Sequence, residues 1–337
     1  ARLLQVQAAV PRSPAQRQQT TGAVCVYPVS EAGGVNETLR APFPWFGGKR
    51  KVAAEVWARF GAVENYVEPF FGSGAVLLGR PGPIVGNETI NDLDGYVANF
   101  WRAIQREPEG VAAWADNPVN ENDLHARHVW LLQQRETLRA RLDGDPEFSD
   151  PKIAGWWVWG MGAFVPGAWC VDQPRRCKPE CAGHFHGKGV HGISLDVKEW
   201  MRDLQARLRR VRVLCGDYKR AVSSVVLSAA RVPAGKIGVF FDPPYAHAGR
   251  DARCYGKHDS PVVFDEVVAW SVEHANEDTR IVIAGYDSRP MPEGWREVAW
   301  RAHGGLGRRV GNENNARERL WLSPACLDPE DCVPRQQ

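Results

Sequence analysis

Short apolar runs alternate with amphipathic stretches in two separate parts of the chain, residues 40–105 and 201–325. The runs that are typical of strands are residues 66–70, 89–92, 211–215, 237–241 and 280–284. Apolar side chains recur at helical spacing in residues 49–60, 97–104 and 264–275. Because a helix between two strands usually carries the chain back across the sheet, this order predicts an α/β fold with a mostly parallel sheet.

Two further runs near the C-terminal end, residues 296–300 and 319–323, predict strands that form a hairpin. A basic, glycine-rich stretch, residues 303–317, joins them. The strands of a hairpin run in opposite directions, so we expect a mixed sheet in which antiparallel strands adjoin the parallel ones.

The pattern changes in residues 106–200, which we interpret as an inserted domain. A helical pattern at 126–142 is followed by a segment dense in Trp, Cys and His. In open α/β sheets, ligands bind at the carboxyl ends of the strands, so an insertion there would lie over the site. We expect Trp156, Trp157 and Trp159 to pack against the sheet-bearing domain rather than stack on bases.

The two ends of the chain lie outside these domains. Residues 1–39 are rich in Gln, Ala, Ser and Gly and have no sustained period, which predicts a loosely ordered extension. Residues 326–337 are interpreted as a C-terminal tail. The expected organisation is therefore one domain formed by residues 40–105 and 201–325, interrupted by the insertion.

Charge and hydropathy narrow the possible partners. The 337 residues carry 42 Lys and Arg against 40 Asp and Glu, a net charge of +2, so any surface for a polyanion must be local. Arginines crowd residues 202–212 and 301–319. No stretch reaches the roughly 18 apolar residues of a membrane span, and the first residues lack the apolar core of a signal peptide. We therefore expect a cytoplasmic protein without membrane contact.

The most specific stretch is Asp242-Pro243-Pro244-Tyr245, directly behind a predicted strand. A carboxylate fixed there can accept one hydrogen of an exocyclic amino group, and the Pro243 carbonyl can accept the other. Two acceptors draw the nitrogen lone pair out of conjugation, so that it can attack an electrophilic methyl group. The Tyr245 ring can stack on a base that has left a duplex. A proline turn with a capping Asp is the plainer alternative.

Acids and glycines also follow two predicted strands upstream. Residues 68–74, EPFFGSG, place Glu68 at a strand end and glycines where the backbone can approach a ligand closely, although an ordinary tight turn is equally typical. Asp92 ends the next strand. An acid at this position commonly holds ribose hydroxyls, and a helix N-cap is the alternative.

Five motifs resemble, in their order, those of Dam-like DNA N6-adenine methyltransferases. They are FPWFGGKRKVA (43–53), EPFFGSG (68–74), INDLD (90–94), CGDY (215–218) and DPPY (242–245). Because the first block precedes the others, the order resembles the alpha group of that family. The resemblance implies a Rossmann-like methyltransferase fold with an inserted target-recognition domain. The N-terminal extension and the Cys-, His- and Trp-rich insertion depart from the family pattern, so the recognised DNA sequence cannot be carried over.

The resemblance also implies S-adenosylmethionine as the cofactor. It puts Trp45 at the adenosine, Lys49 at the carboxylate end and Asp92 at the ribose. Asp217, with Tyr218 beside it, would meet the adenine amino group. The residues that would line the methionine side are Glu68, Phe70, Gly72, Ser73 and Gly74. The catalytic residues would be Asp242, Pro243, Pro244 and Tyr245, with Asp242 also bordering the cofactor.

The insertion contributes candidates for metal and DNA binding. Eight cysteines are too sparse for a disulfide scaffold, and a local Cys/His cluster suggests zinc instead. The candidate zinc ligands are Cys170, Cys177, Cys181 and His184. The spacing from Cys177 through Cys181 to His184 is plausible for zinc, but with His186 and His191 included the six candidates match no standard pair-of-pairs pattern. A loop with buried thiols and with histidines that face phosphates is the alternative. The candidates for contacts with DNA phosphates are Arg175, Arg176, Lys178 and Lys188.

The sequence therefore predicts a site-specific methyltransferase that moves a methyl group from S-adenosylmethionine to N6 of a flipped adenine in double-stranded DNA. N4-cytosine methylation stays open, because both bases offer an exocyclic amine. A catalytically silent DNA-binding module is the alternative outside enzymes. We expect a prokaryotic or phage DNA-modification setting such as restriction-modification, and the sequence does not indicate whether a partner nuclease exists.

Overall fold

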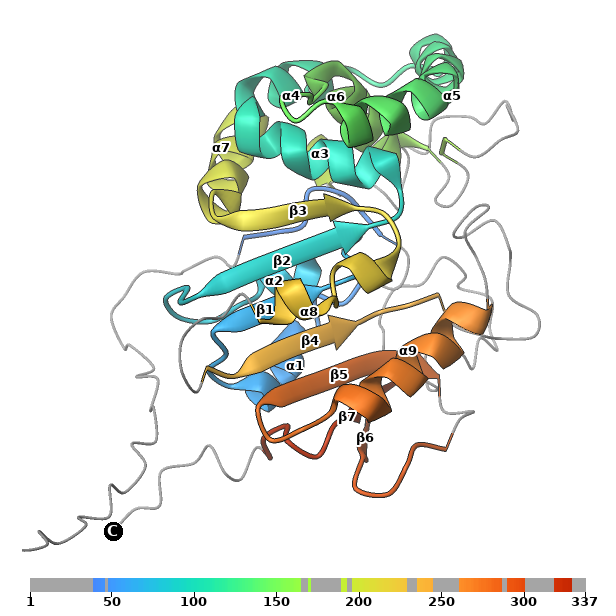
Figure 1. Ribbon diagram of the computed structural model, residues 1–337. Coiled ribbons are helices and arrows are strands. Elements are labelled where there is room, and N and C mark those ends of the chain that lie inside the picture. The colour runs from blue at the N-terminus through green and yellow to red at the C-terminus, as the bar shows by residue number, and fades with distance from the viewer. Residues whose placement is uncertain are drawn as a thin grey trace, which may run out of the picture. The chain divides into compact units, whose positions relative to one another are not determined.

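A seven-stranded sheet forms the centre of the protein (Figure 1). The computed structural model describes residues 39–45, 48–164, 169–170, 189–192, 196–228, 235–244, 261–286, 290–300 and 318–328. The strands are β1 (Asn65–Glu68), β2 (Asn87–Asp92), β3 (Val211–Cys215), β4 (Ile237–Phe241), β5 (Thr279–Tyr286), β6 (Arg296–Ala299) and β7 (Glu318–Leu322). Their order across the sheet is β3-β2-β1-β4-β5-β7-β6.

The sheet is mixed and mostly parallel, as the sequence predicts. Strands β1 to β5 pair with one another in parallel, and β7 is antiparallel to both β5 and β6. Because β7 reverses direction between two neighbours, β6 runs the same way as β5. The expected Rossmann-like α/β fold and the C-terminal hairpin are thus confirmed.

The helices fall into those that flank the sheet and those between β2 and β3. The flanking helices are α1 (Ala53–Phe60), α2 (Ala75–Leu78), α8 (Ser224–Leu227) and α9 (Pro261–His274). The others are α3 (Gly95–Arg106), α4 (Pro108–Ala115), α5 (Glu121–Gly144), α6 (Pro151–Ala163), η1 (Gly189–His191) and α7 (Val197–Leu208), and η2 (Tyr218–Arg220) follows β3.

The helices α1 and α9 cover opposite faces of the sheet (Figure 1). On β5, Arg280 donates to the Phe60 carbonyl at the end of α1. A Cβ atom at Gly285 would instead lie 2.8 Å from the Phe264 ring of α9. Successive residues of a strand point to opposite faces of the sheet. Because Arg280 and Gly285 are an odd number of residues apart on β5, one contacts α1 and the other contacts α9.

Side-chain caps define where most helices of the middle segment begin. Asn120 accepts from the Asp123 backbone N–H at the start of α5, and Asp150 accepts from Ile153 at the start of α6. Each such contact satisfies one of the amides that a helix start leaves without a partner. A proline at the first position of α6 fits the same rule, since its missing N–H costs nothing there.

The middle helices share one hydrophobic core with the sheet. The Trp157 ring of α6 contacts Phe43 and Phe100, at centroid distances of 4.8 and 5.9 Å. The expected packing of this tryptophan against the sheet-bearing part is confirmed. Contrary to the expectation, Trp156 packs on Trp114 and Trp130, and Trp159 packs on Trp169 and His191, all within the middle segment itself.

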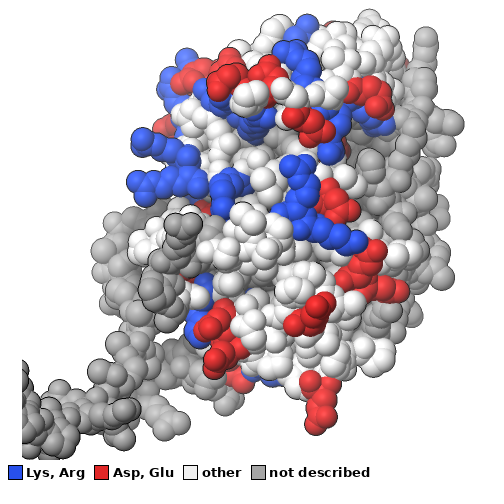
Figure 2. All heavy atoms as spheres, viewed as in Figure 1, with Lys and Arg blue, Asp and Glu red and all other residues white. Residues whose placement is uncertain are grey.

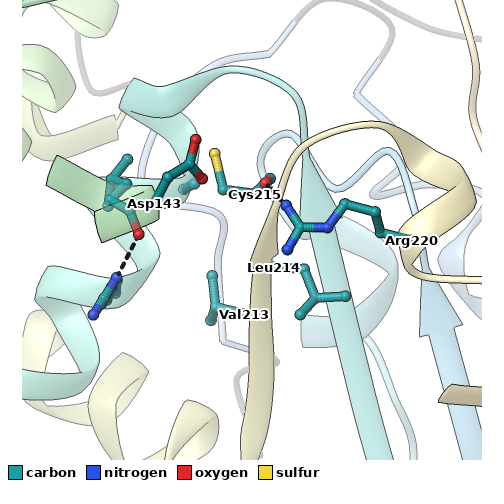
Figure 3. A pocket seen from close by; sticks show the side chains of 8 residues that line it. Asp143, Val213, Leu214, Cys215 and Arg220 are labelled. Carbon is teal, nitrogen blue, oxygen red and sulfur yellow. Dashed lines mark hydrogen bonds between the residues drawn. The ribbon is translucent and has the colours of Figure 1, made fainter. Parts of the chain in front are cut away.

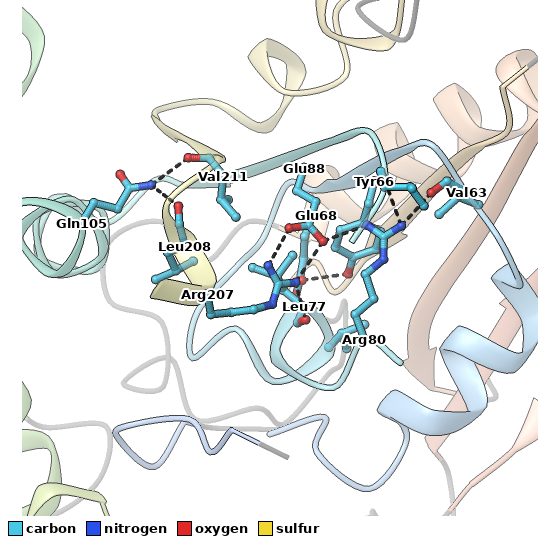
Figure 4. Close-up of polar contacts among 12 residues, drawn as sticks. Val63, Tyr66, Glu68, Leu77, Arg80, Glu88, Gln105, Arg207, Leu208 and Val211 are labelled. Carbon is cyan, nitrogen blue, oxygen red and sulfur yellow. Dashed lines mark hydrogen bonds and ion pairs between the residues drawn. The ribbon is translucent and has the colours of Figure 1, made fainter. Parts of the chain in front are cut away.

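A buried charge network joins α7 to β2 (Figure 4). Glu88 of β2 accepts from Arg80 at 2.8 Å and from Arg207 of α7 at 2.6 and 2.9 Å. Arg207 also donates to the Leu77 carbonyl, at the end of α2. The Glu88 side chain is only 3% exposed, so both arginines are needed to compensate its charge.

Some expectations lie outside the described residues. These include the N-terminal extension up to residue 38, most of the C-terminal tail, the basic stretch 303–317, and the Cys/His-rich part of the middle segment. Within the described ranges, no helix combines the length and apolar character needed to cross a membrane.

Candidate active site

The candidate site lies at the carboxyl edge of the parallel strands. Glu68 ends β1, Asp92 ends β2, and Asp242 directly follows β4. Strand β1 lies between β2 and β4 in the sheet. The sheet therefore brings together acids that are far apart in the sequence, as expected for a ligand site at this edge.

The loop after β1 is shaped by its glycines. Gly72 and Gly74 have left-handed backbone angles, with φ of 48° and 70°. A Cβ atom at Gly72 would lie 2.4 Å from the Trp45 indole nitrogen, so the Trp45 ring lies directly against this loop. The Trp101 indole N–H donates to the Gly72 carbonyl at 3.0 Å. Glycine is required here both for the conformation and for the close approach of the ring.

Two polar side chains of β2 hold the loops at the edge together. The Asp92 carboxylate accepts from the Gly72 N–H and from the Asp94 N–H, both at 2.9 Å. The Asn91 amide donates to the Pro69 carbonyl at 3.0 Å and to the Gly216 carbonyl at 2.9 Å. The helix N-cap is Asp94, not Asp92. Burial raises the pKa of Asp92 to about 7, with the neighbouring Asp94 charge acting in the same direction.

Asp217 and Tyr218 follow β3 but have different surroundings. Asp217 is exposed and caps η2 through the Lys219 N–H. Tyr218 is buried, and its ring stacks on Phe70 with centroids 5.3 Å apart. The two rings place aromatic surface between the loops that follow β1 and β3.

Asp242 forms a short ion pair with Lys49. The Lys49 Nζ atom lies 2.8 Å from Asp242 Oδ2, and the two side chains are 5% and 15% exposed. The Lys49 carbonyl accepts from the Val52 and Ala53 amides, so the residue stands at the entry to α1. Helix α1 starts at Ala53, four residues later than the expected start, which leaves Lys49 outside the helix and able to reach the sheet edge.

Glu68 is buried directly beside this pair. Its carboxylate accepts from the Tyr66 hydroxyl at 2.8 Å. Burial raises the pKa of Glu68 to about 8, the Tyr66 hydrogen bond opposes this rise, and the Asp242 charge adds to it. At pH 7 the buried Glu68 side chain therefore carries its proton most of the time.

Residues 45–143 match the family model of the D12 class N6 adenine-specific DNA methyltransferases. The match covers this part of the chain and supports an adenine-specific DNA methyltransferase. The predicted resemblance and the predicted enzyme class, an adenine-specific DNA methyltransferase, are confirmed by this match. The matched residues include Trp45, the glycine loop and Asp92, whereas Asp217 and Asp242 lie beyond them. No curated protein matches the chain.

The other predicted site residues of this methyltransferase are only partly within the described ranges. Pro243 is buried and Pro244 half-buried beside Asp242. The predicted positions outside the described ranges are Tyr245, Arg175, Arg176, Lys178, Lys188, Cys177, Cys181 and His184.

Nothing in the described structure supports the expected zinc. Of the candidate ligands only Cys170 is described; it is buried, and burial raises the pKa of its thiol. Its backbone N–H contacts His128 Nδ1 at 3.3 Å. No group of three or more potential metal ligands occurs among the described residues.

A small cavity of about 150 Å³ lies beside β3, apart from the Asp242 pair (Figure 3). Arg220 borders it and donates to the Cys215 carbonyl at 2.7 Å. Burial raises the pKa of Cys215 to about 11, so the residue is a neutral thiol at pH 7. The cavity has room for a few water molecules and is too small for a nucleoside.

Basic side chains gather over α7 and β3 on the face in Figure 2, with acids interspersed. Arg209 and Arg210 at the end of α7 are exposed. Arg202 is paired with Glu109 at 2.7 Å. The crowding of arginines in residues 202–212 thus produces a local basic surface on this methyltransferase despite its small net charge.

Sequence reasoning missed three residues that shape the site. Asn91 ties two loops together, Trp101 holds the Gly72 carbonyl, and Trp300 lies over Lys49, with Nζ 5.7 Å from the ring centroid. Asn91 was visible within the INDLD motif but had no assigned role. The two tryptophans carried no local signal, because the fold alone brings them to the site.

Proposed function

We propose that the protein transfers a methyl group from S-adenosylmethionine to N6 of an adenine flipped out of double-stranded DNA. The family match supports DNA adenine methylation in general. The methyl donor, the flipping of the adenine out of the duplex and the roles of individual residues are what we propose beyond that match. The observation that supports the proposal most is the Lys49–Asp242 ion pair of 2.8 Å, because it holds the Asp242 carboxylate in place at the strand end, where it accepts from an N–H donor as a target amine would require.

Asp242 is the proposed acceptor for the target amine. Its side chain is fixed at the end of a central strand and is 15% exposed, so a base entering from the carboxyl edge can reach it. As N6 attacks, positive charge develops on it, and a nearby carboxylate stabilises that charge. The Pro243 carbonyl is proposed to accept the second N6 hydrogen, and Tyr245 to stack on the extruded base.

The residues at the edge fit S-adenosylmethionine in their chemistry. Left-handed glycines bring the backbone of residues 72–74 close to any ligand, and the Trp45 ring covers this loop. When bound, the cofactor supplies an electrophilic methyl group on a sulfonium cation, which aromatic faces and carboxylates attract. We propose that Phe70, Ser73 and Glu68 complete the methionine side of the site.

The remaining cofactor contacts are assigned to three other loops. Asp92 is proposed to meet the ribose, although its two hydrogen bonds to backbone amides show that it also has a structural task. Asp217, exposed beside buried Tyr218, is proposed to meet the cofactor's adenine amino group. Lys49 is proposed to meet the cofactor's carboxylate from its place beside Asp242.

DNA recognition is proposed for residues 106–200. Helices α4, α5 and α6 of this segment pack on α3, which lies beside β3 and β2, so they extend the surface available to a duplex (Figure 1). Arg175, Arg176, Lys178 and Lys188 are the proposed phosphate contacts, and contacts to base edges would give specificity. A DNA substrate also supports the proposed cytoplasmic location in a prokaryotic or phage-infected cell.

The direct test measures transfer of tritiated methyl groups to duplex DNA. We expect the wild-type protein to label DNA, and Asp242→Ala to lose at least about 100-fold in rate, since a preorganised acceptor of developing charge is worth that much. Asp242→Asn should also be slow, because it lacks the charge. Asp278→Ala is the matched control: Asp278 pairs with Lys236 at the opposite edge of the sheet. Near-normal labelling by Asp242→Ala would overturn the assignment.

A further inference from the structure

Trp300 lies at the carboxyl edge of the sheet although it is remote in sequence from every motif. It directly follows β6, and β6 runs parallel to β4 and β5 through the intervening antiparallel β7. The end of β6 is therefore on the same side of the sheet as Asp242. No assigned cofactor or catalytic motif includes Trp300.

The side chain of Trp300 points to the face that α1 covers. Arg296, four residues earlier on the same strand, pairs with Asp328, which also pairs with Arg59 of α1. Residues an even number apart on a strand share a face, so Trp300 faces the α1 side as well. Lys49 stands at the entry to α1, which explains how two residues so distant in sequence meet.

The Trp300 ring contacts the ammonium group that Asp242 holds. Lys49 Nζ is 2.8 Å from Asp242 Oδ2 and 5.7 Å from the Trp300 ring centroid. This lies within the range of a cation–π contact, which strengthens where water is excluded. Lys49 is 4% exposed, so the ring takes the place of water around its charge.

The indole nitrogen of Trp300 adds a second observation. It is buried and has no hydrogen-bond partner among the described residues. No hydrogen bond from the indole N–H therefore fixes the Trp300 side chain. Its contact with Lys49 is made by the face of the ring. If the position needed only apolar filling, an aliphatic side chain would disturb the Lys49 ammonium no more than a phenyl ring would.

We propose that Trp300 is a positioning residue of the methyltransferase, whose ring face holds the Lys49 ammonium against Asp242. The inference rests on the proposed role of Asp242. It predicts that Trp300 acts through Lys49, so the effects of changing the two residues should not add. It also predicts that an aromatic ring, rather than an indole N–H, is required.

The test compares Trp300→Leu, Trp300→Phe and the matched control Trp295→Leu. Trp295 is a partly buried tryptophan at the other end of β6. We expect Trp300→Leu to slow single-turnover methylation about tenfold and Trp300→Phe to stay within about threefold. In a Lys49→Met background, Trp300→Leu should have no further effect. Trp295→Leu should leave the rate unchanged.

A second readout does not depend on activity. Acetic anhydride labels exposed lysines, and mass spectrometry can follow Lys49 alone. We expect Lys49 to react several-fold faster in Trp300→Leu than in the wild type or Trp295→Leu. The inference is overturned by unchanged Lys49 labelling, by additive effects with Lys49→Met, or by a Phe variant as slow as Leu. If the wild-type protein transfers no methyl group, the proposed function fails, while the labelling result still decides the role of Trp300.

Discussion

Gly72 is the position with the least conformational freedom in the loop that follows β1. Its left-handed φ and the Trp45 ring 2.4 Å from the place of a Cβ atom both exclude a side chain. We expect Gly72→Ala to destabilise the protein by about 1–3 kcal/mol and to weaken S-adenosylmethionine binding. Thermal unfolding and calorimetry measure the two effects. Gly144→Ala is the control, because nothing lies within 4 Å of its Cβ position; equal behaviour of the two variants would contradict the account.

Glu68 makes stability depend on pH. Its pKa is raised from 4.5 to about 8 in the folded protein, so the folded state binds the proton more tightly than the unfolded state. The resulting stabilisation is complete below about pH 4.5 and is lost as the pH rises through 8. Between these values we expect Glu68 to lower the free energy of unfolding by roughly 1.4 kcal/mol per pH unit. Asp92 acts in the same direction up to about pH 7.

Glu68→Gln should flatten this dependence, because a neutral amide oxygen can still accept from the Tyr66 hydroxyl. Denaturant unfolding at several pH values measures it. Glu273→Gln, exposed on α9, should keep the wild-type slope. If Glu68→Gln also kept that slope, the buried proton would have to belong to another group.

At the scale of elements, α7 depends on one buried charge contact. Arg207→Met would leave Glu88, which is 3% exposed, with Arg80 as its remaining partner. We expect a loss of about 3 kcal/mol in the free energy of unfolding. Arg202→Met on the same helix breaks an exposed pair with Glu109 and should cost at most about 1 kcal/mol. If chemical denaturation gave equal losses in the free energy of unfolding for the two variants, the buried network would contribute no more to stability than the exposed pair.

The elements also show what periodicity could and could not predict. Every predicted strand exists, because each is an apolar run bounded by turn residues, and the C-terminal hairpin pairs as expected. The order of strands in the sheet was not readable, since pairing such as that of β1 between β2 and β4 depends on crossover geometry. The contact of Lys49 with Asp242 escaped prediction for the same reason. Short helices such as α2 and α8 span one turn and leave no periodic signal.

At the scale of the whole molecule, the central question is whether residues 106–200 bind DNA while the sheet-bearing part binds the cofactor. They share a continuous core with it, so their packing alone does not define a separate domain. We expect charge reversal at Arg175 and Arg176 to weaken DNA binding and to reduce its salt dependence by about one unit of slope per lost phosphate contact. Binding of S-adenosylmethionine should be unchanged. Fluorescence anisotropy at several salt concentrations measures this.

The control for this experiment is Lys236→Glu. Lys236 precedes β4 and therefore lies at the amino edge of the sheet, opposite the site. Charge reversal there should leave the salt slope intact. If both changes altered DNA binding equally, the specific role proposed for residues 106–200 would be wrong, and non-specific attraction would explain the result.

The central claim, that Asp242 directs methyl transfer to N6 of adenine in DNA, is tested most directly by single-molecule sequencing of duplex DNA incubated with the protein and S-adenosylmethionine. We expect N6-methyladenine within one sequence motif for the wild-type protein, and none for Asp242→Ala at equal protein concentration. N4-methylcytosine as the product, or the same adenine methylation by Asp242→Ala, would contradict the account.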